Sequence, residues 1–264
     1  MTTIGIVEIG GAVLQPPERW QDLRDAFGMT PGEAAAMVGG LSRPSKMPGA
    51  AFGLPAAECL TGSRLRAAST AERPTVCGDC YALKGRYMFA NVQAAQYRRL
   101  EILEEALWEE GLADPQQRDG WVEAMVCAIA WAARGSRVFR WHDSGDLRSP
   151  SHLQLLVEVA DRLPWVRFWL PTREGRFVRD WLAGFEPGFF PANLCVRESA
   201  ALVGHIPDGV RALEGDRRFS AVVAPGAELG EGVAACRAPE QGGECADCRA
   251  CWDRGVGVVA YVQH

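Results

Sequence analysis

The spacing of the cysteines constrains this chain more than any other feature. Seven of its nine cysteines fall into two tight groups, whereas disulfide-stabilised proteins spread an even number along the chain. Residues 1–14 lack the basic start and long apolar run of an export signal. The pattern therefore predicts thiolates bound to metal in a reducing, cytoplasmic compartment.

The first group comprises Cys59, Cys77 and Cys80. A stretch of 17 residues separates Cys59 from the Cys-x-x-Cys pair formed by the other two. Three thiolates leave one iron of a four-iron cluster open to an external ligand, so the group predicts an open [4Fe–4S] cluster. Two alternatives remain, a thioredoxin-type redox pair and a Cys-x-x-Cys turn unrelated to Cys59. The redox pair lacks the small domain that normally surrounds such a motif.

The second group supplies four sulfurs, which is a complete site with no open position. Four thiolates satisfy either a structural zinc ion or a closed iron–sulfur cluster. The run Cys-x-x-Cys-x-x-Cys favours a cluster, because zinc ligands usually come as two separated pairs. The four residues are Cys236, Cys245, Cys248 and Cys251.

The two remaining cysteines have apolar neighbours. Cys127 lies in an apolar helical segment and Cys195 within a predicted strand. We expect both to pack in the core as small hydrophobic residues, with ligation of a metal by Cys195 as the alternative.

Composition and charge limit the partners. The chain is 48% hydrophobic and 23% charged, as globular proteins are, and it has no apolar run of the roughly 18 residues that span a membrane. A net charge of −5 argues against duplex DNA as the partner, because binding to phosphates needs a basic surface. We expect a small-molecule or nucleotide substrate, and an electron donor if the protein is redox-active.

Strand-like and helical segments alternate along the chain, which predicts parallel strands joined by crossovers. Residues 1–50 read as a lead-in or cover segment, residues 51–230 as an α/β domain, and residues 231–264 as a cysteine-rich metal-binding segment with a last strand. Strands are expected at 4–7, 51–54, 138–141, 165–170, 194–196, 219–223 and 256–262, and helices at 17–27, 87–110, 116–134, 149–163 and 175–184.

Polar signatures follow several of these strands, at the end where parallel α/β barrels carry their chemistry. They are the first cysteine group, the turn from His142 to Asp146, Thr172-Arg173, and the run from Arg197 to Ser199. We therefore expect a full or partial (β/α) barrel with a site at one mouth. A doubly wound open sheet is the alternative.

The turn from His142 to Asp146 is a candidate binding site. Gly145 permits close approach of a ligand to the backbone, while Ser144 and Asp146 can bind an ammonium or hydroxyl group. The alternative reading is a turn whose polar side chains cap the next helix. Arg173 and Arg197 are of the type that holds a carboxylate or phosphate, or that forms a surface ion pair.

Four motifs in combination resemble the phage gene product 88-like family. They are Cys77-Gly-Asp-Cys80-Tyr-Ala-Leu-Lys-Gly, Arg140-Trp-His-Asp-Ser-Gly-Asp146, Phe168-Trp-Leu-Pro-Thr-Arg173 and the terminal cysteine run. The resemblance covers residues 45–255. It implies no specific activity.

The layout is more distantly similar to radical S-adenosylmethionine enzymes, which carry three cysteines after the first strand and a Gly-Gly-Glu turn after the second. The resemblance implies that Ser144, Gly145 and Asp146 bind the methionine amine. It also implies that Arg173, Arg197 and Ser199 contact the carboxylate and ribose of the cofactor. We expect His142 to be a further cofactor-binding residue. The C-terminal cysteines resemble an auxiliary cluster site. The cysteine spacing and the Ser-Gly-Asp turn depart from that family's pattern.

We therefore expect an iron–sulfur enzyme that uses S-adenosylmethionine at an open [4Fe–4S] cluster, with a second cluster near the C-terminus. The alternative function is a zinc- or cluster-stabilised module that binds a nucleotide or nucleic acid without redox chemistry.

Overall fold

The computed structural model describes residues 14–107, 114–184, 190–214 and 216–263, so the strand expected at residues 4–7 lies outside the described residues. Seven strands form one sheet in the order β1-β2-β3-β4-β5-β7-β6. Every neighbouring pair is parallel. The strands are β1 (Ala50–Phe52), β2 (Val138–Trp141), β3 (Arg167–Thr172), β4 (Leu194–Ser199), β5 (Arg218–Val223), β6 (Val233–Ala235) and β7 (Val258–Val262).

The long helices begin where the sequence supplies caps. The side chain of Asp114 accepts a hydrogen bond from the Gln116 amide, and Ser149 accepts one from the His152 amide; a proline follows each cap. The helices are α1 (Trp20–Phe27), α2 (Pro31–Met37), α3 (Leu60–Ala67), α4 (Ala90–Ala106), α5 (Pro115–Ala133), α6 (Pro150–Arg162), α7 (Gly175–Gly184) and α8 (Gly209–Glu214).

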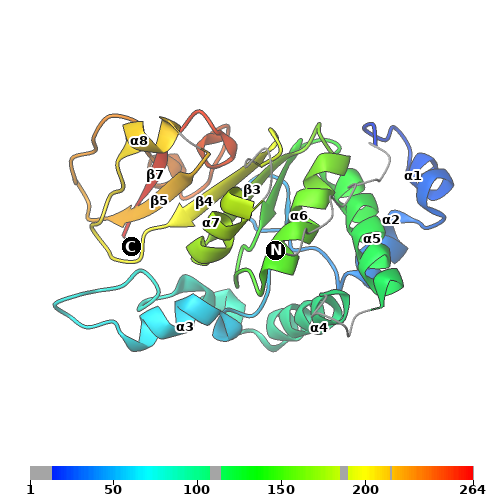
Figure 1. Ribbon diagram of the computed structural model, residues 1–264, viewed down its shortest axis with the longest axis horizontal. Helices are drawn as coiled ribbons and strands as arrows, with labels where there is room; N and C mark the ends of the chain where they lie inside the picture. Colours follow the sequence, from blue (N-terminus) through cyan, green and yellow to red (C-terminus); the bar gives the residue numbers. More distant parts are fainter. Residues whose placement is uncertain (1–13, 108–113, 185–189, 215, 264) are drawn as a thin grey trace.

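One face of the sheet is covered by helices. Right-handed crossovers between consecutive neighbouring strands place the connecting helices on the same side. Figure 1 shows α6 and α7 lying across β3 and β4, with α5 beside them. The main hydrophobic core lies between these helices and the alternate strand residues Phe139, Trp141, Phe168, Leu170, Leu194 and Val196.

The opposite face carries the C-terminal cysteine segment, and we call it the cysteine-loop face. Because side chains alternate along a strand, Val138 and Trp169 point to this side, where they form a smaller cluster with Trp252. Met47, Cys251 and Tyr261 pack against that cluster. The last segment of the chain is therefore folded back onto the centre of the sheet.

The predicted α/β class with parallel strands is confirmed, but the pairing does not close a barrel. β1 and β6 are the two outer strands in the order of the sheet. The doubly wound alternative is also not observed, because β1 to β5 follow one another without the reversal that defines that fold. No helix in the described parts of the chain is long and apolar enough to cross a membrane.

Most of the expected strands and helices after residue 50 are present, with shifted ends. Four short elements were not predicted, namely α2, α3, α8 and β6. Helix α2 starts at a capping box, in which Thr30 and Glu33 bond each other's backbone amides, inside the segment read as a cover. Helix α3 has little apolar periodicity because its sequence is Leu-Thr-Gly-Ser-Arg-Leu-Arg-Ala, so no pattern revealed it.

Candidate functional site: two cysteine groups

The first cysteine group lies at the carboxyl end of β1. Cys59 immediately precedes α3, while Cys77 and Cys80 lie in the loop that follows that helix. A Cβ atom placed on Gly62 would lie 3.7 Å from the sulfurs of both Cys59 and Cys77. The two sulfurs therefore face one space, and the glycine adds no side chain to it. All three thiols are free and partly buried.

A buried carboxylate holds the start of α3. The amide and hydroxyl of Thr61 donate to the two carboxylate oxygens of Glu174, at 2.8 and 2.9 Å. Glu174 follows β3 and is only 1% exposed. It thus fixes the helix that begins next to Cys59. Sequence reasoning missed Glu174, although it directly follows the Thr-Arg motif that was singled out.

The loop with Cys77 is tied to the loop after β4. Thr75 and Leu202 form an isolated antiparallel bridge, and the Val76 amide donates to the Ala201 carbonyl at 3.0 Å. Figure 1 shows α3 and the segment after it running along one end of the strands. The segment that carries the first group is therefore anchored at both β3 and β4.

Asp146 lies beside the first group and is buried. It accepts hydrogen bonds from the Thr172 hydroxyl at 2.6 Å and from the Arg173 amide at 2.7 Å. Burial raises the pKa of Asp146 to about 6, against the effect of these hydrogen bonds. Burial also raises the pKa of the Cys59 thiol, and the negative charge of Asp146 adds to that effect. The carboxylate is thus a negative group within electrostatic range of Cys59.

The rest of the turn after β2 is packed against β1. The Ser144 hydroxyl donates to the Leu54 carbonyl at 2.8 Å and accepts from Gln96 at 2.7 Å. Gly145 has a φ of 76°, and a Cβ there would lie 2.6–2.9 Å from atoms of Leu54. These two residues hold the ends of β1 and β2 together in this structure.

His142 is buried next to a second histidine and has a left-handed backbone, with φ of 52°. Its ring lies 5.3 Å from the ring of His152, between centroids. Burial lowers the pKa of His142 to about 3, so the imidazole is neutral at ordinary pH.

The two arginines predicted at strand ends bond to main-chain carbonyls. Arg173 donates to the Ala200 carbonyl. Arg197 is 0% exposed, and its donors are directed at five carbonyl groups. The Ser199 hydroxyl, by contrast, accepts a hydrogen bond from the Ser220 hydroxyl at 3.1 Å. The five carbonyls bonded by Arg197 belong to Phe219, Ala250, Cys251, Asp253 and Val256, at 2.6–3.2 Å.

The second group surrounds a cavity on the cysteine-loop face. All four of its cysteines line this one cavity, together with Trp252 and Val259. Tyr261 lies with its hydroxyl 3.2 Å from the sulfur of Cys251. Burial raises the pKa of Cys251 to about 12, although the Tyr261 hydroxyl and Arg197 act against it. The four residues are Cys236, Cys245, Cys248 and Cys251.

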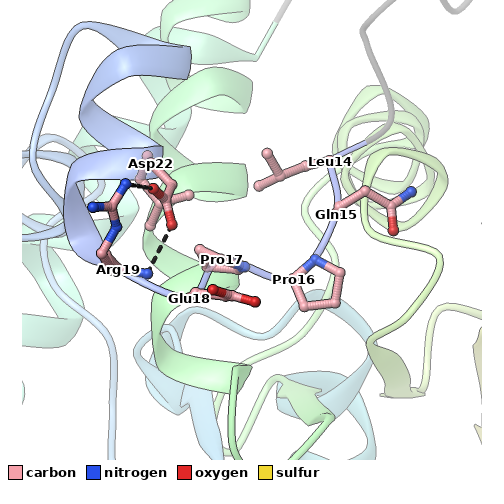
Figure 2. Close-up of a pocket in the computed structure, with 8 residues that line it drawn as sticks. Leu14, Gln15, Pro16, Pro17, Glu18, Arg19 and Asp22 are labelled. Carbon is pink, nitrogen blue, oxygen red and sulfur yellow. Dashed lines mark hydrogen bonds and ion pairs between the residues drawn. The ribbon is translucent and has the colours of Figure 1, made fainter.

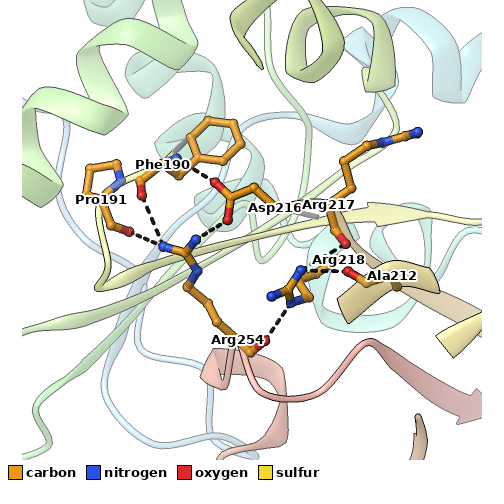
Figure 3. A network of polar contacts seen from close by, with 7 residues as sticks. All are labelled: Phe190, Pro191, Ala212, Asp216, Arg217, Arg218 and Arg254. Carbon is orange, nitrogen blue, oxygen red and sulfur yellow. Dashed lines mark hydrogen bonds and ion pairs between the residues drawn. The ribbon is translucent and has the colours of Figure 1, made fainter. Parts of the chain in front are cut away.

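A second arginine network supports the segment that follows the cysteine run. Arg254 donates to the carbonyls of Phe190 and Pro191 and pairs with Asp216 (Figure 3). Arg218 donates to the Arg254 carbonyl at 2.5 Å. These bonds connect the start of the last strand to the loops before β4 and β5.

The remaining cysteines and a second hollow are not part of either group. Cys127 and Cys195 are both 0% exposed, as expected for core residues. A hollow near the start of the described chain is lined by Leu14 to Arg19, Asp22 and Leu23 (Figure 2). Its Arg19 and Asp22 pair with each other, and it contains no cysteine or histidine.

The structure thus gathers the predicted ligands in two separate places. Within the described residues, no three histidine, cysteine or acidic side chains are arranged tightly enough to hold a single metal ion. Gly62, Glu174 and Tyr261 adjoin the two groups and were not predicted from sequence. No spacing pattern in the sequence predicts these three residues, because each comes near its cysteine group only when the chain is folded.

Comparisons with known proteins identify a family but no close relative. Neither the curated proteins nor the solved structures include a significant match. The family model for gene product 88 matches residues 29–254, which is the greater part of the chain and includes both cysteine groups. The chain therefore belongs to the gene product 88 family.

Proposed function

We propose that this protein is an iron–sulfur enzyme with two clusters. Cys59, Cys77 and Cys80 would hold a [4Fe–4S] cluster with one open iron, and the four C-terminal cysteines would hold a second, closed cluster. The observation that supports this proposal is that four free thiols line one cavity while three others gather at the carboxyl edge of the sheet.

The residues present fit clusters better than zinc. A tetrahedral zinc ion with bonds of about 2.3 Å needs its four sulfurs roughly 4 Å apart. In a cluster each cysteine binds a different iron, so the sulfurs stand further apart. The four C-terminal thiols line one cavity, and their Cys-x-x-Cys-x-x-Cys run favours a cluster over the two separated pairs that are usual for zinc.

The first site also fits an open cluster. Its three thiols leave one coordination position free, and Gly62 keeps the space before Cys59 and Cys77 clear of a side chain. The carboxylate of Asp146 lies within electrostatic range of Cys59. We propose that the sheet is a partial barrel of the radical S-adenosylmethionine type, in which a reduced open cluster supplies radical chemistry with bound S-adenosylmethionine.

The chain's own residues would prepare this site in distinct ways. Glu174 orients the start of α3, and thereby Cys59, through its two bonds to Thr61. Asp146 presents a buried negative charge that can receive an ammonium group. Arg173, directly after β3, and Ser199, at the end of β4, remain the candidates for contacts to carboxylate and ribose, whereas Ser144 and Gly145 would act by holding β1 and β2 together.

Metal analysis and spectroscopy test this proposal. Protein purified anaerobically is expected to contain iron and sulfide, and S-adenosylmethionine should perturb the spectrum of the reduced cluster and be cleaved with dithionite. Stoichiometric zinc without iron or sulfide would instead favour the alternative function, a metal-stabilised module that binds a nucleotide or nucleic acid. If the cluster is present but S-adenosylmethionine neither perturbs its spectrum nor is cleaved, the proposed enzymatic activity is refuted and the iron–sulfur assignment is kept.

A further inference from the structure

Arg140 of β2 lies between residues that adjoin the two cysteine groups in sequence. Its Nη2 donates to the Tyr81 hydroxyl at 3.0 Å, and Tyr81 directly follows Cys80. Its guanidinium carbon lies 4.4 Å from the ring centre of Trp169. Trp169 in turn packs edge-on against Trp252, which follows Cys251, with ring centroids 5.3 Å apart. Arg140 therefore stands between the two groups on the sheet.

The positive charge of Arg140 has no carboxylate partner within ion-pair distance in the described ranges. Its Nε is buried without any acceptor, and its Nη1 faces only the weak thioether acceptor of Met47, at 3.6 Å. Arg197, on the same face, has its donors satisfied by carbonyls. Arg140 is half-buried, its Nη2 also donates to the His142 carbonyl at 3.3 Å, and Asp143 acts on its charge from beyond ion-pair distance. A further negative charge placed nearby would stabilise this cation.

We propose that Arg140 is a counter-charge shared by the two cysteine sites, which stabilises the reduced state of both. This inference rests on the proposed function, since each site carries thiolates and gains a further negative charge when its cluster is reduced. Nearby charge and hydrogen bonds set the potentials of such clusters.

Tyr81 connects Arg140 to the first cysteine group through hydrogen bonds of its hydroxyl. Its hydroxyl accepts from Arg140 and donates to the Asp143 carbonyl at 2.7 Å, so the residue after Cys80 is fixed to the end of β2. Loss of this hydroxyl alone should alter only the nearby site. Loss of the arginine charge should alter both.

The test is a redox titration of the anaerobically loaded protein, followed by electron paramagnetic resonance. In Arg140→Gln we expect the reduction equilibrium of both clusters to shift about tenfold toward the oxidised state, which is about 59 mV for a one-electron couple. Arg140→Lys keeps the charge and should recover most of this shift. Tyr81→Phe should leave the second cluster unchanged, and Arg211→Gln, at an exposed position on α8, should change neither.

Two outcomes separate this inference from the function on which it rests. If the parent protein binds no iron, the proposed function fails. If the iron content is normal and Arg140→Gln shifts neither reduction potential, or only one of them, the role of Arg140 as a shared counter-charge is refuted. The proposal that the protein holds two clusters is then unaffected. Should the glutamine variant not fold, Arg140→Met keeps the apolar stem on Trp169 and carries the same test.

Discussion

Replacement of Arg197 by methionine should detach the C-terminal cysteine segment from the sheet. The guanidinium is fully buried and donates to five carbonyls, three of which belong to the segment from Ala250 to Asp253. Methionine keeps the length and apolar stem of the side chain but removes the guanidinium donors, while the Ala250 and Asp253 carbonyls keep backbone bonds from the Asp253 and Val256 amides.

The magnitude follows from these bonds. A hydrogen bond to a charged group contributes about 1.5–3 kcal/mol, and each buried acceptor left without a partner costs about 1–3 kcal/mol. The sum overstates the loss, because burial of the guanidinium is itself costly and the loop can reach water when it detaches. We therefore expect the free energy of unfolding to fall by about 3–5 kcal/mol.

Urea unfolding measures this loss. Trp252 lies within the detached segment and is 3% exposed, so its fluorescence should report release of the segment. Arg211→Met, on an exposed position of α8, is the matched control and should change stability by less than about 0.5 kcal/mol. A loss below about 1 kcal/mol in Arg197→Met would refute the view that this arginine holds the segment in place.

Three further predictions concern the buried polar groups near the first site. Burial raises the pKa of Asp146 from 3.8 to about 6, so the folded state holds this proton more tightly and stability falls as pH rises through that interval. Asp146→Asn should remove that slope from urea unfolding measured between pH 4 and 7. Burial lowers the pKa of His142 from 6.5 to about 3, so its contribution to stability is lost as pH falls below 6.5. His142→Asn, which tolerates the left-handed backbone, should flatten the acid limb of the same curve, and an unchanged limb would contradict the assignment. Glu174→Gln weakens the two hydrogen bonds to Thr61, so the free energy of unfolding should fall by about 1–3 kcal/mol and the iron content should fall at the first site only. Glu240→Gln, at an exposed position, should change neither the stability nor the iron content.

The sequence predicted the scaffold well where periodic patterns were long. The helices α4, α5 and α6 follow from apolar residues spaced three or four apart, and α6 also from its cap at Ser149. Short elements such as α3 and β6 have too few residues for a period to emerge. Closure of the sheet depends on the curvature of the strands, which no local pattern encodes.

The candidate site was predicted unevenly, for a related reason. Ligand spacing is local, so each cysteine group was proposed from the sequence without the fold. The partners of Arg197 are not local, because four of the five carbonyls it bonds lie more than 50 residues away and carry no side-chain signal. The same is true of Glu174 and Thr61, which meet only when β3 and the start of α3 come together.

The iron content of group-specific variants tests the central claim most directly. We predict about eight irons per chain in the anaerobically loaded parent, four from each [4Fe–4S] cluster, and the same in Cys127→Ser. Serine at Cys59, Cys77 and Cys80 should remove about half of the iron and sulfide, and serine at the four C-terminal cysteines should remove the other half. Iron that persists in full after either replacement, or zinc in place of iron at both groups, would contradict the account.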